Sequence, residues 1–155
     1  MKYLIMLAVL TFFTSVVSAD TKSELNGRWL CPIKSEEEGI IFKIALYNQY
    51  DVKNMRYNSK GINSMYLDSP EPLAQYSSTE SGTFEIENDL LIFKFESVDF
   101  KVINDPAKIL SPELFKELTE SYAANSDPVK ILSISAGVRI SIDPVTGKSS
   151  ECYKI

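Results

Sequence analysis

Residues 83–102, TFEIENDLLIFKFESVDFKV, contain the clearest structural pattern in this chain of 155 residues. Apolar and charged side chains alternate there with a period of two, which is the period of a β-strand with one buried face. The apolar residues that follow this alternation are Phe84, Ile86, Leu91, Phe93, Phe95, Val98, Phe100 and Val102. Asn88-Asp89 interrupts the alternation with residues that favour a tight turn. The segment therefore predicts a hairpin over residues 83–95 and a further strand over residues 98–102, packed beside it.

Shorter strand signals occupy most of the remaining chain. They lie at residues 28–33, 40–47, 50–57, 62–67, 73–77, 129–134, 138–142 and 151–155. Residues 143–147, DPVTG, separate two of them with a turn in which proline and glycine supply the required φ angles. About eight to ten short antiparallel strands in one chain are typical of a closed barrel, which leaves no strand edge unpaired.

One segment has helical rather than strand periodicity. Ser111 suits the N-cap position, and Pro112 follows it where a missing N–H costs no hydrogen bond. Apolar residues then recur at helical spacing, at Leu114, Phe115, Leu118 and Tyr122. The sequence thus predicts a helix over residues 112–124 that covers an edge or one end of the sheet. We expect an all-β fold with one short helix, arranged as an antiparallel meander β-barrel.

The first nineteen residues have the layout of a secretory signal peptide. Lys2 precedes an apolar run that is too short to span a membrane, and small residues end the run before Asp20. We predict a signal peptide over residues 1–19 and a single β-barrel domain over residues 20–155. The mature protein would be periplasmic or secreted, with no membrane association after cleavage.

Cys31 and Cys152 are the two cysteines of the chain. In an exported protein, two cysteines have one intramolecular pairing, so we expect a disulfide that joins the first strand to the last. Such a bond fits a barrel, where the first and last strands meet. The alternatives are a reactive thiol or a metal site, and the second would need further soft or imidazole ligands that the chain lacks.

The composition argues against several kinds of site. The chain has no histidine, which removes Ser-His and Cys-His catalysis and histidine-ligated zinc. Its formal net charge is −5 and its basic residues are scattered, so it lacks the basic stripe that nucleic-acid binding requires. The sequence has no nucleophile elbow and no phosphate-binding loop. We expect neither an enzyme nor a metal or cofactor site.

The segment LNGRW, residues 25–29, resembles the opening of a lipocalin-like (calycin) barrel. That family begins its first strand with a Gly-x-Trp motif, here Gly27-Arg28-Trp29, which closes the narrow end of the barrel beneath a late arginine. The resemblance implies that Arg139 covers Trp29 through a cation–π contact. The alternation within residues 138–142 predicts the opposite. With the valine and isoleucines of that strand facing inward, Arg139 would point outward.

The barrel and this resemblance imply ligand binding in the interior. The candidates for the cavity wall are aromatic residues on the predicted strands: Tyr47, Tyr57, Phe84, Phe93 and Phe100. The same side chains would serve as ordinary packing if the interior is filled. The leading hypothesis is an exported barrel that binds a small apolar or amphipathic ligand.

A protein–protein module is the second hypothesis. Ser81-Gly82-Thr83-Phe84 resembles the start of the Ser-Gly-x-x-Tyr-like loop of bacterial periplasmic lysozyme inhibitors, which are small disulfide-closed β-barrels. Glu85 stands where that loop has its aromatic residue. An acidic chain also suits a basic partner such as lysozyme. An inhibitor or immunity protein for a cell-wall hydrolase is therefore the alternative.

Overall fold

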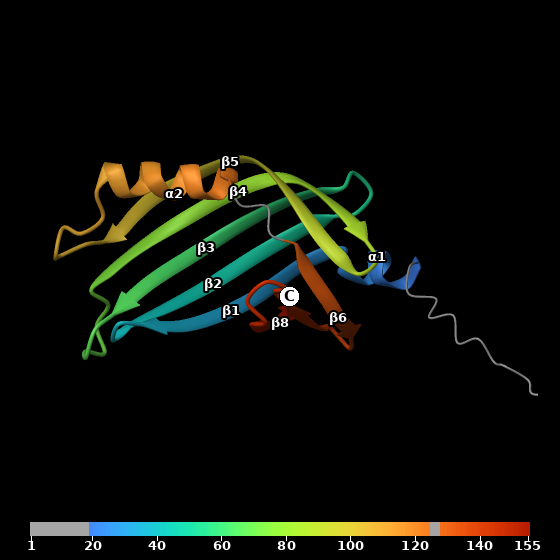
Figure 1. Ribbon diagram of the computed structural model, residues 1–155, viewed down its shortest axis with the longest axis horizontal. Coiled ribbons are helices and arrows are strands. Elements are labelled where there is room, and N and C mark those ends of the chain that lie inside the picture. The colour runs from blue at the N-terminus through green and yellow to red at the C-terminus, as the bar shows by residue number, and fades with distance from the viewer. Residues whose placement is uncertain (1–18, 125–127) are drawn as a thin grey trace, which may run out of the picture.

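The computed structural model describes residues 19–124 and 128–155 of the chain (Figure 1). The predicted signal peptide lies, apart from Ala19, outside the described residues. Two helices are present, α1 (Ala19–Leu25) and α2 (Pro112–Ala124). The strands are β1 (Gly27–Glu37), β2 (Ile40–Asp51), β3 (Arg56–Tyr66), β4 (Ala74–Glu87), β5 (Leu90–Asn104), β6 (Val129–Ser135), β7 (Val138–Ile142) and β8 (Ser149–Lys154).

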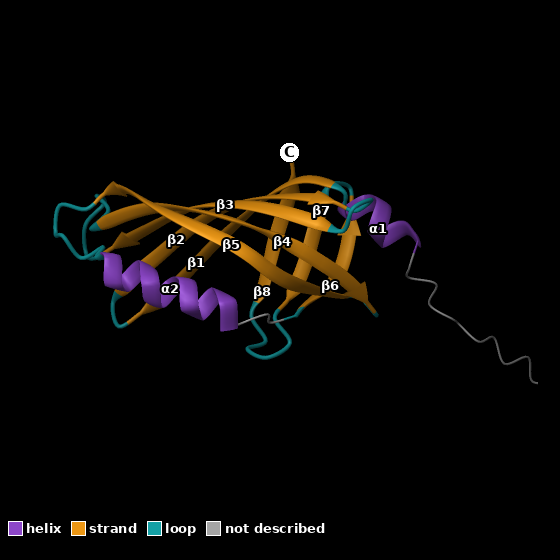
Figure 2. Ribbon diagram, turned by 90° about the horizontal axis from the view of Figure 1, so that it is seen from above, coloured by secondary structure: helices purple, strands orange, loops and turns teal. Residues whose placement is uncertain are grey.

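The strands form one antiparallel meander that closes on itself. Each strand pairs with the next, and β8 pairs back with β1, so that the sheet is a closed barrel of eight strands within the described residues (Figure 2). The predicted all-β meander barrel is confirmed. Helix α2 has the predicted bounds, and the Ser111 hydroxyl accepts a hydrogen bond from the Leu114 N–H at 3.1 Å, as an N-cap does. Helix α1 was not predicted.

The predicted strand over residues 50–57 is wrong, because a reverse turn divides it. Its first residues end β2 and its last residues begin β3. The Asp51 carboxylate accepts hydrogen bonds from the backbone and side-chain amides of Asn54, at 3.1 and 2.7 Å, and these bonds lower its pKa. Met55 then adopts a positive φ of 52°. The spacing of Asp51 and Asn54 is a turn signal, but the neighbouring residues with strand preference led to the prediction of a strand.

Strands β4 and β5 are longer than their sequence signals. Segments predicted as separate strands, residues 73–77 and the start of the hairpin, belong to one β4, and β5 likewise continues through residues 98–102. A register shift between Ser81 and Gly82 lets the ladder continue where the alternation changes phase. A Cβ at Gly82 would overlap the backbone carbonyl oxygen of Lys94. The glycine therefore permits a close approach of β5 and does not end the strand.

The barrel is closed by strands β6–β8, which pair with the long strands β1 and β5 at few positions. β1 pairs with β8 at Trp29 and Leu30, and β5 pairs with β6 at Leu90 and Leu91, whereas β1 and β2 pair along their full length. Strands β6–β8 complete the barrel near α1, and α2 lies along β5 in the other half of the molecule (Figure 2). The barrel interior is therefore packed near α1 and bordered by α2 farther along.

Candidate functional site

Trp29 seals the barrel at the α1 end. Its side chain is fully buried, and its indole N–H donates to the Leu25 carbonyl oxygen at 2.7 Å, which ties β1 to α1. Gly27, between the two, has a φ of 112°, in the region that favours glycine. On the C-terminal strand, the Lys154 ammonium lies 5.5 Å from the indole centroid and donates to the Glu24 carbonyl oxygen. Within Gly-x-Trp, the glycine makes the bend that turns the tryptophan inward.

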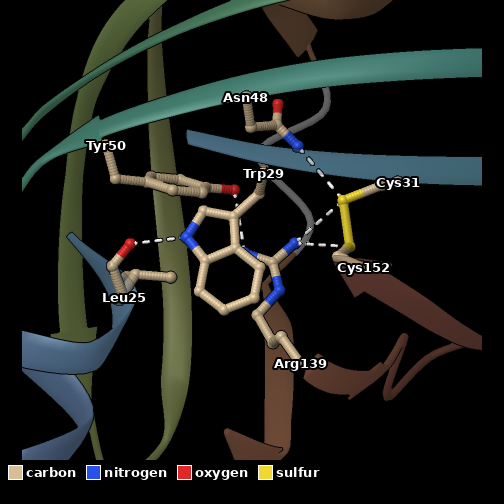
Figure 3. Close-up of a disulfide and its surroundings, with 7 residues drawn as sticks. All are labelled: Leu25, Trp29, Cys31, Asn48, Tyr50, Arg139 and Cys152. Atoms are coloured by element: carbon tan, nitrogen blue, oxygen red, sulfur yellow. Dashed lines mark hydrogen bonds between the residues drawn. A yellow bond between two sulfur atoms is a disulfide. The ribbon is translucent and has the colours of Figure 1, made fainter. Parts of the chain in front are cut away.

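Arg139 lies over the same indole. Its guanidinium carbon is 5.7 Å from the Trp29 ring centroid and 5.4 Å from that of Tyr50 (Figure 3). The alternation in β7 predicted an outward arginine, and that prediction is wrong, since Arg139 is 4% exposed and Ile140 is 39% exposed. The inward face of β7 meets aromatic rings whose π-faces attract a cation, so the arginine is inside. The relation between Arg139 and Trp29 is the one that the lipocalin-like resemblance implied.

The Cys31–Cys152 disulfide is confirmed and completes the same cluster (Figure 3). One terminal nitrogen of Arg139, Nη2, donates to both sulfurs, at 3.3 and 3.0 Å, and Nη1 donates to the Tyr50 hydroxyl at 3.1 Å. The Asn48 amide donates to the Cys31 sulfur at 3.4 Å. The arginine Nε is buried and has no hydrogen-bond partner among the described residues. The closed end is thus one connected unit built from β1, β2, β7 and β8.

A cavity of about 270 Å³ adjoins this closed end inside the barrel. All eight strands and α2 contribute to its lining. The apolar part of the wall includes Leu46, Leu91, Phe95 and Val129, and the polar part is Asn48, Glu80, Arg139 and Ser150. Apolar walls with a few polar groups are typical of small-molecule sites.

Three of the five predicted wall residues lie near the cavity, and two of these line it. Tyr57 and Phe93 are in the lining, and their rings meet in a T-shaped contact at 4.9 Å. Phe84 is fully buried, but it packs edge-on against Tyr50, 5.6 Å between centroids, and is not in the lining. Its role is core packing, the alternative that the sequence left open.

The other two predicted wall residues lie elsewhere, which corrects the prediction. Tyr47 is 41% exposed and on the outer face of β2, because its neighbours Leu46 and Asn48 point into the cavity. Phe100 lies farther along β5 and stacks on Phe115 of α2, with 5.2 Å between ring centroids. Alternation alone did not show where along the barrel the interior is packed and where it is hollow.

Glu80 is a wall residue that the sequence signals missed. It lies on β4 and is paired in register with Ser59 and Val98, neither of which carries a charge. Burial raises the pKa of its carboxyl group. None of the salt bridges formed among the described residues includes it. The signal was present: with β4 read as one continuous strand, Glu80 falls in phase with buried Phe84, four residues later.

Two of the tyrosines that line the cavity with Glu80, Tyr57 and Tyr122, resist ionisation. Burial, and then the negative charge of Glu80, raises the pKa of Tyr122 to about 12 and raises the pKa of Tyr57 as well. Both phenols therefore stay neutral at physiological pH, and both lie close enough to Glu80 to sense its charge. This part of the cavity combines one carboxylate with neutral aromatic rings.

The segment that resembles the start of the lysozyme-inhibitor loop is not a loop. Ser81 pairs with Asn58 of β3 on one side and Ser97 of β5 on the other, and Phe84 is fully buried. A segment in the middle of a sheet cannot reach into a partner's active site as an exposed loop can. This corrects the expectation that the second resemblance raised.

No protein-family model matches the chain, and no curated protein has a matching sequence. The closed eight-stranded meander is compatible with a lipocalin-like fold.

In the part of the chain that the structure describes, no three histidine, cysteine, aspartate or glutamate side chains are grouped to hold a metal ion. None of the described helices is long and apolar enough to cross a membrane.

Proposed function

We propose that this protein is an exported binding protein that holds a small amphipathic ligand inside its barrel. The observation that carries the proposal is the cavity of about 270 Å³ with a predominantly apolar lining. For scale, an engineered apolar cavity of roughly 150 Å³ is enough to bind benzene. A ligand with one aromatic ring and a short polar chain therefore matches the available space.

The covalent structure supports the exported location. The Cys31–Cys152 disulfide suggests an oxidising compartment, since structural disulfides persist outside the cytosol. The signal-peptide pattern in residues 1–19 points to the periplasm or to secretion. We assign no glycosidase role to the cavity, because glycoside hydrolysis typically uses two carboxyl groups and the lining contains one.

The alternative function, inhibition of a basic cell-wall hydrolase, has weaker support. It rests on the formal net charge of −5, which suits a basic partner, and on the resemblance of a segment that lies within β4. Retention on immobilised lysozyme tests it. Salt-sensitive retention would favour the inhibitor, and no retention at low or moderate salt would remove it.

Toluene is a suitable first probe of the proposed site. We expect it to shift the methyl NMR resonances of Leu46, Leu91 and Val129, which line the cavity. At ten times its dissociation constant it should stabilise the fold by about 1.4 kcal/mol. Val129→Phe should fill part of the cavity and abolish these effects. Leu132→Phe is the control, because Leu132 lies on the same strand and is 53% exposed.

The outcome that contradicts the proposal is equally concrete. If toluene at millimolar concentration neither shifts the cavity methyl resonances nor changes the midpoint of unfolding, the interior does not accept ligands. If Val129→Phe and Leu132→Phe weaken binding equally, the toluene occupies another place. Either result would refute the cavity as the functional site.

A further inference from the structure

We propose that the cavity selects a cationic ligand, an ammonium group on a small apolar body, and that Glu80 and the aromatic rings around it bind the ammonium. This inference rests on the proposed function and adds the chemical class of the ligand. It follows from three features of the cavity: a carboxylate with no cationic partner, aromatic rings beside it, and an arginine that is already occupied.

Among the described residues, no salt bridge includes the carboxylate of Glu80. Its cross-strand neighbours, Ser59 and Val98, are uncharged. Lys94, on the adjacent strand β5, forms its salt bridge with Glu85, and both of these side chains are exposed. A carboxylate held in an apolar cavity costs free energy unless a cation meets it. A ligand that carries a positive charge would provide the missing partner.

Aromatic rings line the cavity beside this carboxylate. Tyr57, Phe95 and Tyr122 all belong to the same lining as Glu80, and the Phe95 and Tyr122 rings are 6.0 Å apart. The faces of such rings attract an ammonium ion through their quadrupoles, most strongly where water is excluded. Both phenols stay neutral, so they add ring faces and hydroxyls without a second negative charge. A carboxylate among aromatic rings is complementary to an ammonium and repels an anion.

Arg139, the positively charged residue of the lining, does not offer an equivalent site for an anion. Its guanidinium is stacked between the rings of Trp29 and Tyr50, and its terminal nitrogens donate to the Tyr50 hydroxyl and to the disulfide sulfurs. The remaining nitrogen, Nε, has no contact with solvent. The terminal nitrogens of Arg139 therefore bond within the closed end, and Glu80 is a carboxylate of the wall that no salt bridge among the described residues includes.

Three probes of similar size and different charge test the inference: phenethylammonium, its neutral analogue 2-phenylethanol, and the anion phenylacetate. Their dissociation constants would be measured by calorimetry on the full mature protein at neutral pH. A charge-assisted contact in a partly desolvated site predicts that phenethylammonium binds on the order of tenfold more tightly than 2-phenylethanol. Phenylacetate should bind more weakly than either.

Glu80→Gln removes the charge and keeps the shape of the side chain. We expect this variant to lose the preference, so that phenethylammonium and 2-phenylethanol bind with similar dissociation constants. Glu87→Gln is the matched control, since Glu87 lies on the same strand, is exposed, and changes the net charge of the protein by the same amount. The control should keep the full preference for the cation.

The possible results separate this inference from the proposed function. Binding of 2-phenylethanol with no preference for the cation refutes the cationic ligand and leaves the cavity function standing. An unchanged preference in Glu80→Gln refutes the assignment of the ammonium site to Glu80. Tightest binding of phenylacetate refutes it in favour of an anionic ligand. Failure of all three probes, together with failure of toluene, refutes the proposed function itself.

Discussion

Removal of the Cys31–Cys152 disulfide should detach β6–β8 before the rest of the barrel unfolds. These three strands are joined to the others by few backbone contacts, because β1 and β8 pair at two positions and β5 and β6 pair at two positions. By contrast, β2 and β3 pair at eleven positions. The disulfide is the covalent link across the β1–β8 closure, and it connects residues 121 positions apart in the sequence.

The loop length sets the size of the expected effect. In the chain-entropy model, closure of a loop of about 120 residues stabilises the native state by about 5 kcal/mol at 25 °C. Native disulfides removed from small secreted domains give about 2–5 kcal/mol. In the Cys31→Ser/Cys152→Ser double variant, the serine hydroxyls can still accept hydrogen bonds from Arg139. We therefore expect a loss of about 2–5 kcal/mol in the free energy of unfolding, most of it from the lost cross-link.

Two measurements check this prediction. Urea unfolding followed by circular dichroism gives the free energy of unfolding of the wild type, with and without reductant, and of the double variant. Native-state hydrogen exchange then shows where the loss is located. In the double variant, backbone amides of β6–β8 should exchange faster than those of β2–β4. The circular dichroism signal of the β-sheet should persist.

The reasoning fails in either of two cases. If reductant leaves the urea midpoint of the wild type unchanged, the cysteines are not paired as the structure has them. If exchange accelerates uniformly in all strands of the double variant, β6–β8 is not a separately held unit. The double variant treated with reductant is the control, since it has no bond to reduce.

The remaining predictions concern three single residues. Trp29→Phe loses the hydrogen bond to the Leu25 carbonyl and part of the cation–π contact, so it should destabilise the fold by about 1–3 kcal/mol in urea unfolding; an unchanged midpoint would contradict the sealing role. Gly82→Ala should cost about 1–3 kcal/mol, because the new methyl group overlaps the Lys94 carbonyl, and a neutral effect would show that β5 moves away freely. Glu80→Gln should stabilise the ligand-free protein by ~1 kcal/mol at pH 7, because it removes a partly buried carboxylate. This value is at the low end of the usual cost of burying an unpaired polar group, since the carboxylate keeps part of its solvent contact. The folded-state pKa of Glu80 lies above its ordinary value of 4.5, so the wild type loses stability relative to this variant as the pH rises through the interval between the two, and the difference disappears at lower pH. A difference in the melting temperature that is the same at pH 3 and pH 7 would refute the assignment.

The fold class was readable from short-range patterns. The alternation in residues 83–102 identified the hairpin and its turn, although it divided β5 into two strands. The Ser111 cap with the apolar stripe after it located α2 to the residue. The two cysteines had one partner each, so their pairing needed no structural information. These features depend on neighbours in the chain or on simple counting.

The errors have a common physical origin. Residues 50–57 have strand composition, but a side-chain hydrogen bond from Asn54 to Asp51 makes a turn there. Gly82 fell between two predicted strands, in a segment compared with the start of a loop, although it lies within β4 and accommodates the backbone of the facing strand. In each case the outcome was decided by a specific contact, which average residue preferences do not contain.

By itself, the sequence determined that this chain forms an antiparallel meander with one covering helix and one disulfide. Strand periodicity and helix caps depend on neighbouring residues, and two cysteines allow one pairing. Only the tertiary structure decided which inward positions are packed and which face a cavity. Arg139 is inside because two aromatic rings from β1 and β2 receive it, and Glu80 faces the cavity because β4 is continuous past a bulge. The contact of Arg139 with Trp29 depends on the closure of the sheet, which brings together residues more than 100 positions apart along the chain.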